Sequence, residues 1–502
     1  MRKYINDVIK DINILSWKDG DIITLNAPTG SRKTTFVLER LIEFAREKGK
    51  KILILVNRKK LNEQVESNAK KTLWKNYNLR EEDVHNYIKI STYQHIETLK
   101  KNKNYNFDNY FDDYEYIVCD ECHYFFSDEF TGNTDLSLDV ILKATNKKRI
   151  FMTGTGEIIF NYLKDEGIKT IDYFIERDYS YINKIYFWNY DNTVDEILED
   201  CYEKKQKVIF FSTNIKHLYE LYIRYIDDSY FYCSNNKKNN KYKKHISKEI
   251  DEMITNEEIK TFDKLFLFTT NVLDCGINIE DNNLHIIILD IPDIETLQQC
   301  VGRKRIKEND SKDYVDLYVR NISNNQLKNY LNIEYKKIEK ASYLKQYDEL
   351  IYVDKYGRDN PDNYIYDIIE NGCIIKKVKE TNFYKSKKLI DLYTSLLKHS
   401  NGYISEILKR FKQKNNIKYT QEEQKVRKSL QTYLSNIIDK PLNESQQKYL
   451  IEKIGYIFAG HKYKKIENLN EGLKINKFAY KIIVEGNKWI VKKNNNTGKL
   501  AS

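Results

Sequence analysis

Cysteine is scarce in this chain. Its 502 residues contain seven cysteines, an odd number spread along the whole length. Such a set excludes a disulfide framework of the kind that stabilises small secreted domains. Cys119 and Cys122 form a C-x-x-C pair, but no second pair follows at zinc-site spacing, so we expect both to be small buried residues at the end of a strand.

Long hydrophobic runs are also missing. No run of 18 or more apolar residues exists, and this predicts no transmembrane helix. The N-terminal residues 1–17 are interrupted by Asn6, Asp7 and Asp11, and they lack a signal-peptide core and a small-residue cleavage site. We therefore expect a cytoplasmic protein without a membrane partner. The sequence leaves its oligomeric state open.

Acidic residues are in short supply towards the C-terminus. Residues 371–502 contain 28 Lys and Arg and 11 Asp and Glu, which gives this segment a net charge of +17. The whole chain has 84 basic and 74 acidic residues, so residues 1–370 contain 56 basic and 63 acidic residues and have a net charge of −7. A basic segment of this kind favours contact with nucleic acid. The alternative is compositional drift, because Lys, Asn, Tyr and Ile are abundant throughout.

The order of apolar runs predicts an α/β fold. At roughly 100–200 residues per domain, the length indicates two to four domains. Helix-like stretches alternate with apolar runs, as in parallel-sheet βαβ units. The expected strands of a first unit are 21–28, 51–57, 84–93, 114–121 and 148–155, and those of a second are 184–190, 206–214, 228–236, 264–278, 283–292 and 313–321. After about residue 325 the pattern is mostly helical, with a hairpin expected at 478–494.

Residues 27–35, APTGSRKTT, have the pattern of a phosphate-binding loop between a strand and a helix. Such a loop binds phosphates through backbone N–H groups and the positive end of the helix. Gly30 lies at the tight turn, Lys33 stands where a lysine reaches the β- and γ-phosphates, and Thr34 where a hydroxyl holds Mg²⁺. Arg32 replaces the usual glycine. An arginine with ordinary helical dihedral angles and an outward side chain would still allow binding.

Two charged clusters suit the same chemistry. Asp120 and Glu121 follow an apolar strand, where the first carboxylate can hold Mg²⁺ and the second can orient the attacking water. Arg303 and Arg305 follow a helix of the second unit and can stabilise charge on a γ-phosphate. A solvated turn and a surface basic patch are the respective alternatives.

In this order the motifs resemble those of superfamily 2 helicases of the DEAD/DEAH-like group, over about residues 1–325. The segments similar to motifs I, Ia, Ib, II, III, IV, V and VI are APTGSRKT (27–34), VNRKKL (56–61), STYQHI (91–96), DECH (120–123), TGT (153–155), FFSTN (210–214), TTNVLDCGINI (269–279) and QQCVGRKR (298–305).

The resemblance implies two tandem RecA-like domains, 1–180 and 181–325, that bind ATP and Mg²⁺, followed by a mostly helical basic region, 326–502, that contacts nucleic acid. The implied catalytic residues are Lys33, Asp120, Glu121, Gln299, Arg303 and Arg305, and the implied metal ligands are Thr34 and Asp120. The implied nucleotide-binding residues are Pro28, Thr29, Gly30, Ser31, Arg32, Lys33, Thr34, Thr35 and Gly276. Arg58, Thr92 and Thr270 would contact nucleic acid, and Thr153 and Thr155 would couple the two sites.

Two departures bear on function. The second arginine of motif VI comes one residue early, a form similar to that of herpesvirus-type origin-binding and phage helicases, so we expect Arg303 to be the first candidate for the phosphate and Arg305 the second. No glutamine-type adenine-recognition motif precedes the loop, which argues against a DEAD-box RNA helicase. The resemblance to origin-binding helicases is what makes DNA the favoured partner.

The sequence supports three functions. The first is an ATP-dependent DNA helicase or translocase. The second is a nucleic-acid-stimulated ATPase that remodels protein–DNA or RNA complexes without separating strands. The third is a nucleic-acid-binding protein in which Arg32 has ended ATP turnover, although the intact pairs Lys33-Thr34 and Asp120-Glu121 oppose it.

Overall fold

A computed structural model gives the fold of the chain. It describes residues 3–494 except 29, 58, 78–79, 103–104, 108, 128–132, 190, 235–236, 256–260, 275–278, 307–312, 359–361, 371–372, 400, 415–417, 420, 458–464 and 487. The chain divides into two compact units, one of residues 1–178 and 331–392 and the other of residues 179–330 and 393–502. The domain limits expected from the sequence, after residues 180 and 325, stay predictions.

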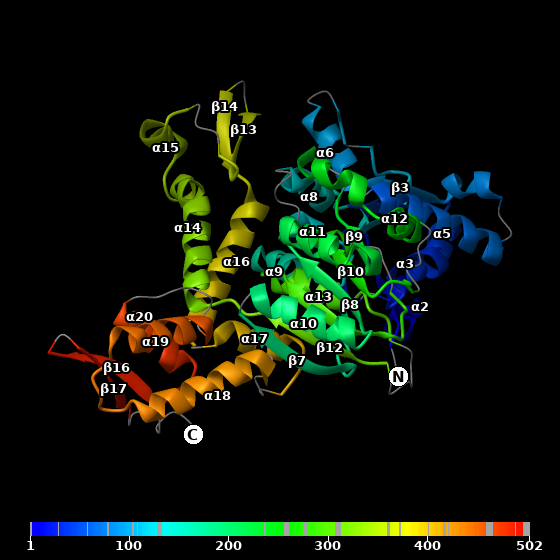
Figure 1. The fold of residues 1–502 in the computed structure, drawn as a ribbon. Helices are drawn as coiled ribbons and strands as arrows, with labels where there is room; N and C mark the ends of the chain where they lie inside the picture. The colour runs from blue at the N-terminus through cyan, green and yellow to red at the C-terminus, as the bar shows by residue number, and fades with distance from the viewer. Residues whose placement is uncertain are drawn as a thin grey trace. The chain divides into compact units, whose positions relative to one another are not determined.

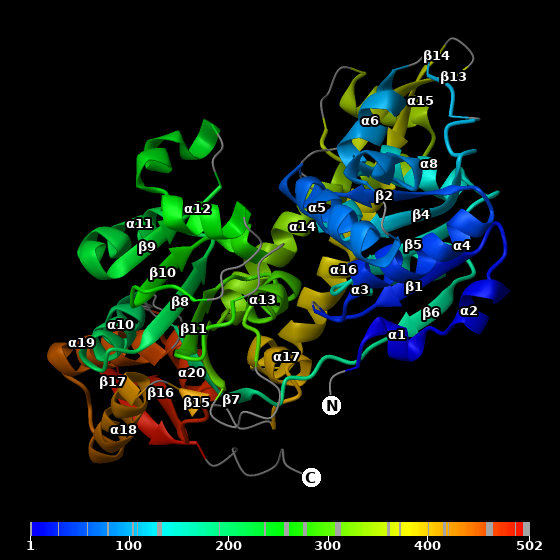
Figure 2. The same cartoon turned by 90° about the vertical axis from the view of Figure 1, so that its right-hand side faces the viewer.

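Unit 1 is built on a six-stranded sheet with the order β3-β2-β4-β5-β1-β6, in which every pair of neighbours is parallel. Its strands are β1 (Ile22–Asn26), β2 (Lys51–Val56), β3 (Ile88–Thr92), β4 (Tyr114–Asp120), β5 (Lys148–Thr153) and β6 (Ile171–Phe174). Figure 2 shows β4, β5, β1 and β6 side by side. Since these strands are parallel, their carboxyl ends share one edge of the sheet, where open α/β folds bind ligands.

Both faces of this sheet are buried. Ile52 and Ile54 of β2 pack into one core layer, whereas Leu53 and Leu55 pack into the other. This alternation explains why the continuous apolar run 51–57 forms a strand covered on both faces. The helical elements around the sheet are α1 (Ile5–Val8), α2 (Asp11–Ser16), α3 (Lys33–Phe36), η1 (Val37–Leu41), α4 (Ile42–Glu47), α5 (Lys59–Tyr77), η2 (Glu81–Asn86), α6 (Tyr93–Lys101), α7 (Tyr124–Ser127), α8 (Thr134–Lys143) and α9 (Glu157–Asp165).

Unit 2 repeats the design with a seven-stranded parallel sheet of order β15-β7-β12-β11-β8-β10-β9. Its strands are β7 (Ile182–Trp188), β8 (Lys207–Ser212), β9 (Ser229–Tyr232), β10 (Phe266–Thr269), β11 (Leu284–Asp290), β12 (Val315–Arg320) and β15 (Lys418–Tyr419). Helical elements of this part are α10 (Asp191–Glu203), α11 (Ile215–Arg224), η4 (Ile226–Asp228), η5 (Lys237–His245), α12 (Lys248–Thr255), η6 (Asn271–Asp274) and α13 (Ile294–Val301).

The basic C-terminal segment contributes to both units. Residues 331–392 of unit 1 comprise most of α14 (Asn324–Gln346), α15 (Glu349–Tyr356), the antiparallel pair β13 (Ile365–Glu370) and β14 (Cys373–Val378), and most of α16 (Glu380–Leu397). Unit 2 includes α17 (Gly402–Arg410), α18 (Gln421–Asn436), α19 (Glu444–Ile457), α20 (Ile466–Ile475) and the hairpin β16 (Tyr480–Glu485) and β17 (Lys488–Lys493). The last five elements enclose a small core of their own, seen in orange and red in Figure 1.

The prediction of two parallel-sheet units followed by a mostly helical region is confirmed. The hairpin expected at 478–494 is present, with Gly486 at a positive φ of 55°. The expected list of strands was incomplete, because β6, the β13–β14 pair and β15 were not anticipated. Among the helices described above, none is long and apolar enough to cross a bilayer.

Candidate active site

The phosphate loop joins β1 to α3 at the carboxyl edge of the unit 1 sheet. The Ala27 N–H donates to the carbonyl of Thr153 over 3.0 Å, and the Ser31 N–H donates to the carbonyl of Pro28 over 3.2 Å, which closes a tight turn. Gly30 has a φ of 81°, a left-handed conformation that glycine adopts without strain. Thr29 lies outside the described residues. The loop is thus fastened to β5, the strand next to β1.

Lys33 is the first residue of α3, and its side chain folds back over the loop. Its Nζ donates to the carbonyls of Ala27 and Pro28 over 2.9 and 3.3 Å, and the residue is only 8% exposed. Thr34 and Thr35 follow in the first helical turn and are half-buried. The ammonium group is therefore held against the backbone of the loop.

Arg32 takes an unexpected conformation. It has φ 62° and ψ 39°, in the left-handed region, and not the ordinary helical dihedral angles considered from the sequence. Its side chain is exposed, and its guanidinium carbon lies 4.4 Å from the centre of the Tyr4 ring. The arginine thus reproduces the backbone shape that glycine would adopt at this position.

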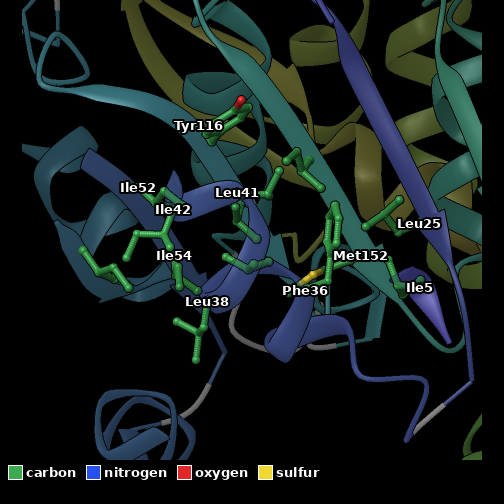
Figure 3. Close-up of a cluster of buried hydrophobic side chains, with 14 of the residues drawn as sticks. Ile5, Leu25, Phe36, Leu38, Leu41, Ile42, Ile52, Ile54, Tyr116 and Met152 are labelled. Atoms are coloured by element: carbon green, nitrogen blue, oxygen red, sulfur yellow. The ribbon is translucent and has the colours of Figure 1, made fainter. Parts of the chain in front are cut away.

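The helix after the loop is anchored in the core of unit 1. It continues from α3 through the π-helical segment η1 into α4, and Phe36, Leu38, Leu41 and Ile42 pack against β2 and β5 (Figure 3). The Phe36 N–H donates to the carbonyl of Arg32 over 3.0 Å. This packing positions the start of the helix, and with it Lys33 and Thr34, relative to the sheet.

Asp120 ends β4, and Glu121 begins the turn after it. The Glu121 N–H donates to Oδ1 of Asp120 over 2.9 Å, and Glu121 itself has a left-handed φ of 47°. The buried Tyr93 hydroxyl donates to the carbonyl of Asp120 over 2.8 Å. Burial raises the pKa of Asp120 to about 7; the neighbouring Glu121 charge raises it too, whereas Lys33 lowers it. A carboxylate in this setting needs a positive partner to remain ionised.

A hydrogen-bonded network connects this acidic pair to β5. The Thr153 hydroxyl lies 2.9 Å from Nδ1 of His123, 3.3 Å from Oε2 of Glu121, and accepts from the N–H of Thr155 over 3.1 Å. His123 Nδ1 is also 3.3 Å from Oε2 of Glu121. Thr153, Thr155 and His123 are all buried. The motif II and motif III segments are therefore joined by side-chain hydrogen bonds.

Thr92 caps α6 at the end of β3. Its hydroxyl accepts from the His95 N–H over 3.2 Å. Gln94 of the same segment donates to the carbonyl of Asn57 over 2.9 Å, so the segment is tied to the end of β2. Arg58, the next residue, lies outside the described residues, and its expected contact with nucleic acid stays a prediction.

Unit 2 contains the second group of candidate residues. Thr270 follows β10 and its hydroxyl accepts from the Val272 N–H over 3.4 Å, whereas Gly276 lies outside the described residues. The ends of the motif V and motif VI segments are paired, because the Ile279 N–H donates to the Arg303 carbonyl over 2.9 Å and the Arg305 N–H donates to the Ile279 carbonyl over 2.8 Å. Gln299, on α13, is half-buried.

The basic cluster GRKR is not one uniform patch. Arg303 is 3% exposed and Arg305 is half-buried. The Lys304 side chain is completely buried; its Nζ forms an ion pair with the equally buried Asp313 and donates to the Asp281 carbonyl over 2.9 Å. Lys304 is therefore a structural residue between two candidate catalytic arginines, a distinction that the sequence pattern does not reveal.

Sequence reasoning missed several residues that shape the site. Tyr4 and Tyr93 support the loop and Asp120, respectively, and no local motif marks either of them. His123 was included in the DECH motif of the sequence, but no role was assigned to it. Its hydrogen bond to Thr153 depends on the pairing of β4 with β5. Cys119 and Cys122 are fully buried, as expected. Within the described ranges, no cluster of three or more potential ligands suits a tightly bound metal ion.

Two protein families match parts of the chain. The family described as type III restriction enzyme, res subunit, matches residues 1–158, and the helicase conserved C-terminal domain family matches residues 190–306. No curated protein is significantly similar in sequence to the chain.

Several solved helicase structures have limited similarity to the chain. Dbp5 of S. cerevisiae, bound to RNA and ADP BeF3, has 14% identity over 65% of this chain and 85% of its own, with a TM-score of 0.45. Mss116p, bound to ssRNA and AMP-PNP, has 17% identity over 61% and 67%, with a TM-score of 0.43. Lhr of Mycobacterium smegmatis, bound to ssDNA and AMP-PNP, has 15% identity over 64% and 46%, with a TM-score of 0.41. Similarity at this level adds nothing to the functional assignment.

The assignment rests on the two matched families and on the ordered motifs. The first family covers the segment with the phosphate loop, the acidic pair and Thr153, and the second covers motifs IV and V and ends at the basic cluster of motif VI. The chain therefore belongs to the superfamily 2 helicases, enzymes that bind nucleic acid and hydrolyse ATP.

Proposed function

We propose that this protein is a DNA helicase that couples ATP hydrolysis to movement along one strand. The observation that carries the proposal is the connected network of Asp120, Glu121, His123 and Thr153 beside the phosphate loop. Such a network lets the state of the nucleotide reach another part of the protein, which is the requirement for a motor.

The residues of unit 1 suit a nucleotide with its metal ion. The Ser31 hydroxyl is buried in the loop and has no hydrogen-bond partner among the described residues, and a phosphate oxygen would satisfy it. Lys33 would bind the β- and γ-phosphates, with Pro28, Gly30 and Thr35 lining the loop. Mg²⁺, held by Thr34 and Asp120, would neutralise phosphate charge. Glu121 would orient the attacking water, because its carboxylate is fixed by Thr153 and His123.

The roles of the unit 2 residues follow the family pattern. We assign Arg303 first and Arg305 second to stabilisation of the γ-phosphate charge, with Gln299 beside them and Gly276 near the nucleotide. Arg58, Thr92 and Thr270 would contact the nucleic-acid backbone, which is recognised without regard to sequence. Replacing the arginine that contacts the γ-phosphate, Arg303 or Arg305, with alanine should lower the stimulated rate of ATP hydrolysis about 10³-fold or more.

The C-terminal residues would add affinity for nucleic acid. Exposed lysines gather on α20 and the β16–β17 hairpin and just beside them, namely Lys465, Lys474, Lys477, Lys481, Lys488 and Lys493. Tyr384 is excluded from this surface, because its ring packs against Phe126 and Tyr162 and its hydroxyl donates to Asp165. The proposed contact is electrostatic and salt-sensitive.

Steady-state ATP hydrolysis tests the proposal. The rate is measured without nucleic acid and with single-stranded DNA, duplex DNA and RNA, at low and moderate salt. We expect stimulation by single-stranded DNA that Glu121→Gln abolishes, whereas Asp139→Asn, a partly exposed carboxylate of α8, leaves it unchanged. Stronger stimulation by RNA would contradict the DNA preference.

A strand-displacement assay separates a helicase from a remodelling ATPase. A duplex with a single-stranded overhang on either side is mixed with protein and ATP. Release of a strand, dependent on Glu121, is the expected result. DNA-stimulated hydrolysis without release from either substrate would contradict unwinding and favour an ATPase that remodels complexes.

A further inference from the structure

The left-handed conformation of Arg32 requires a structural cause. A residue with a Cβ atom is strained at φ 62°, because Cβ approaches the neighbouring carbonyl oxygen. Glycine would take this conformation freely. Some contact must therefore hold Arg32 in place, and the contacts come from the N-terminal segment of residues 3–17.

The N-terminal segment is fastened along the loop and its helix. The Ile5 N–H donates to the Ser31 carbonyl over 3.1 Å, and the Ile5 side chain is buried in the core that contains Phe36. Figure 3 shows Ile5 at the edge of this cluster. Further along the segment, Asp11 pairs with Arg40 of η1. These contacts fix the position of Tyr4 independently of its contact with Arg32.

We propose that Tyr4 is a positioning residue for nucleotide binding. Its ring holds the guanidinium of Arg32 at 4.4 Å, turned outward, and so stabilises the left-handed backbone in which the loop can present its N–H groups to phosphates. In this chain a contact with the N-terminal segment replaces the conformational freedom of glycine. The inference rests on the proposed function, because it presupposes that the loop binds phosphate.

The size of the effect follows from the contact. A cation–π contact at a partly exposed site changes an equilibrium constant by about two- to five-fold. Removal of the Tyr4 ring should weaken nucleotide binding by this factor, because Arg32 then leaves the left-handed conformation part of the time. When residue 32 is glycine, the Tyr4 ring has no guanidinium to contact, and removal of the ring should not change the affinity for nucleotide.

The test is a double-mutant cycle read by the Kd of fluorescently labelled ADP. The variants are Tyr4→Leu, which keeps the apolar bulk, Tyr4→Phe, which keeps the ring, Arg32→Gly, and the double variant Tyr4→Leu/Arg32→Gly. We expect Tyr4→Leu to raise Kd about two- to five-fold and Tyr4→Phe to leave it unchanged. Arg32→Gly should bind at least as tightly as the parent protein, and Tyr4→Leu should have no effect in that background.

Tyr77 offers a matched control. Its ring holds Arg46 at the same distance of 4.4 Å, between α5 and α4, away from the loop. Tyr77→Leu should leave Kd unchanged although it removes a cation–π contact of the same length. Thermal unfolding of every variant distinguishes a loss of affinity from a loss of folded protein.

Two results would overturn the inference while leaving nucleotide binding intact. If Tyr4→Leu weakens binding equally in the Arg32→Gly background, the ring acts on the nucleotide itself. If Arg32→Gly weakens binding ten-fold or more while Tyr4→Leu has no effect, the arginine contacts phosphate directly. If the parent protein fails to bind labelled ADP at all, the proposed function fails together with the inference.

Discussion

Removal of the Lys304 ammonium group should destabilise unit 2 far more than removal of an exposed lysine. The Lys304 and Asp313 side chains are both 0% exposed, and Lys304 Nζ also donates to the Asp281 and Arg305 carbonyls over 2.9 and 3.2 Å. Lys304→Met keeps most of the side-chain volume but leaves Asp313 as a buried charge that has lost this cation. A buried ion pair broken in this way costs about 3–5 kcal/mol.

The double variant Lys304→Met/Asp313→Leu should recover most of this loss. Two well-packed apolar side chains avoid the desolvation of both charges, and such replacements are often neutral or better. The matched control is Lys204→Met, since Lys204 and Asp200 form an ion pair on α10 with side chains 56% and 55% exposed. An exposed pair of this kind contributes about 0–1 kcal/mol.

The assay is native-state hydrogen exchange measured on peptides of β11 and β12, because a chain with two compact units need not unfold in one step. A loss of about 3–5 kcal/mol corresponds to exchange faster by roughly 10²- to 10³-fold or more. If Lys304→Met exchanges like Lys204→Met, or if the double variant is less stable than either single one, the assignment of Lys304 as a buried structural charge is refuted.

Three further predictions follow from named contacts. Thr153→Val removes the hydroxyl that contacts Glu121, His123 and the Thr155 N–H, and the loss of these three hydrogen bonds should lower the DNA-stimulated rate of ATP hydrolysis about ten-fold or more; an unchanged rate would contradict the coupling role. Burial alone would raise the pKa of Glu115, but its contacts with Lys148 and Lys48 lower that pKa overall. Glu115 therefore stabilises the fold above its unfolded pKa of about 4.3, and this stability is lost as the pH falls through the lower folded pKa. Glu115→Gln should make the stability of unit 1 fall less steeply below about pH 5, and an equally steep fall in the variant would refute this prediction. Lys481→Glu/Lys488→Glu on the hairpin should weaken DNA binding and reduce its salt slope by about 2 or more, whereas Lys204→Glu should change neither in measured binding isotherms.

The amino-acid sequence alone determined the elements whose signals are local. Apolar runs such as 51–57 and 114–121 formed the predicted buried strands, because the residues of a parallel strand face a core on both sides. The loop composition at 27–35 and the acid pair at 120–121 indicated their chemistry because each motif requires only a few adjacent residues. Motif order along the chain then indicated two α/β units and the helicase family.

Tertiary structure decided whatever depends on residues far apart in sequence. Arg32 adopts a left-handed conformation beside Tyr4, 28 residues away, so its own neighbours could not reveal it. In the cluster GRKR the middle lysine is buried by Asp281 and Asp313, although the sequence shows three similar cations.

The C-terminal segment shows the same limit. Tyr384 stands close to Lys385, Lys387 and Lys388 in the sequence, yet its ring packs on Phe126 and Tyr162 of unit 1. The two-residue strand β15 exists only because the edge of β7 offers it backbone partners. Composition indicated the chemistry that these residues can perform, whereas the packing of distant segments decided which of them are exposed to perform it, because burial and charge pairing are properties of the folded chain.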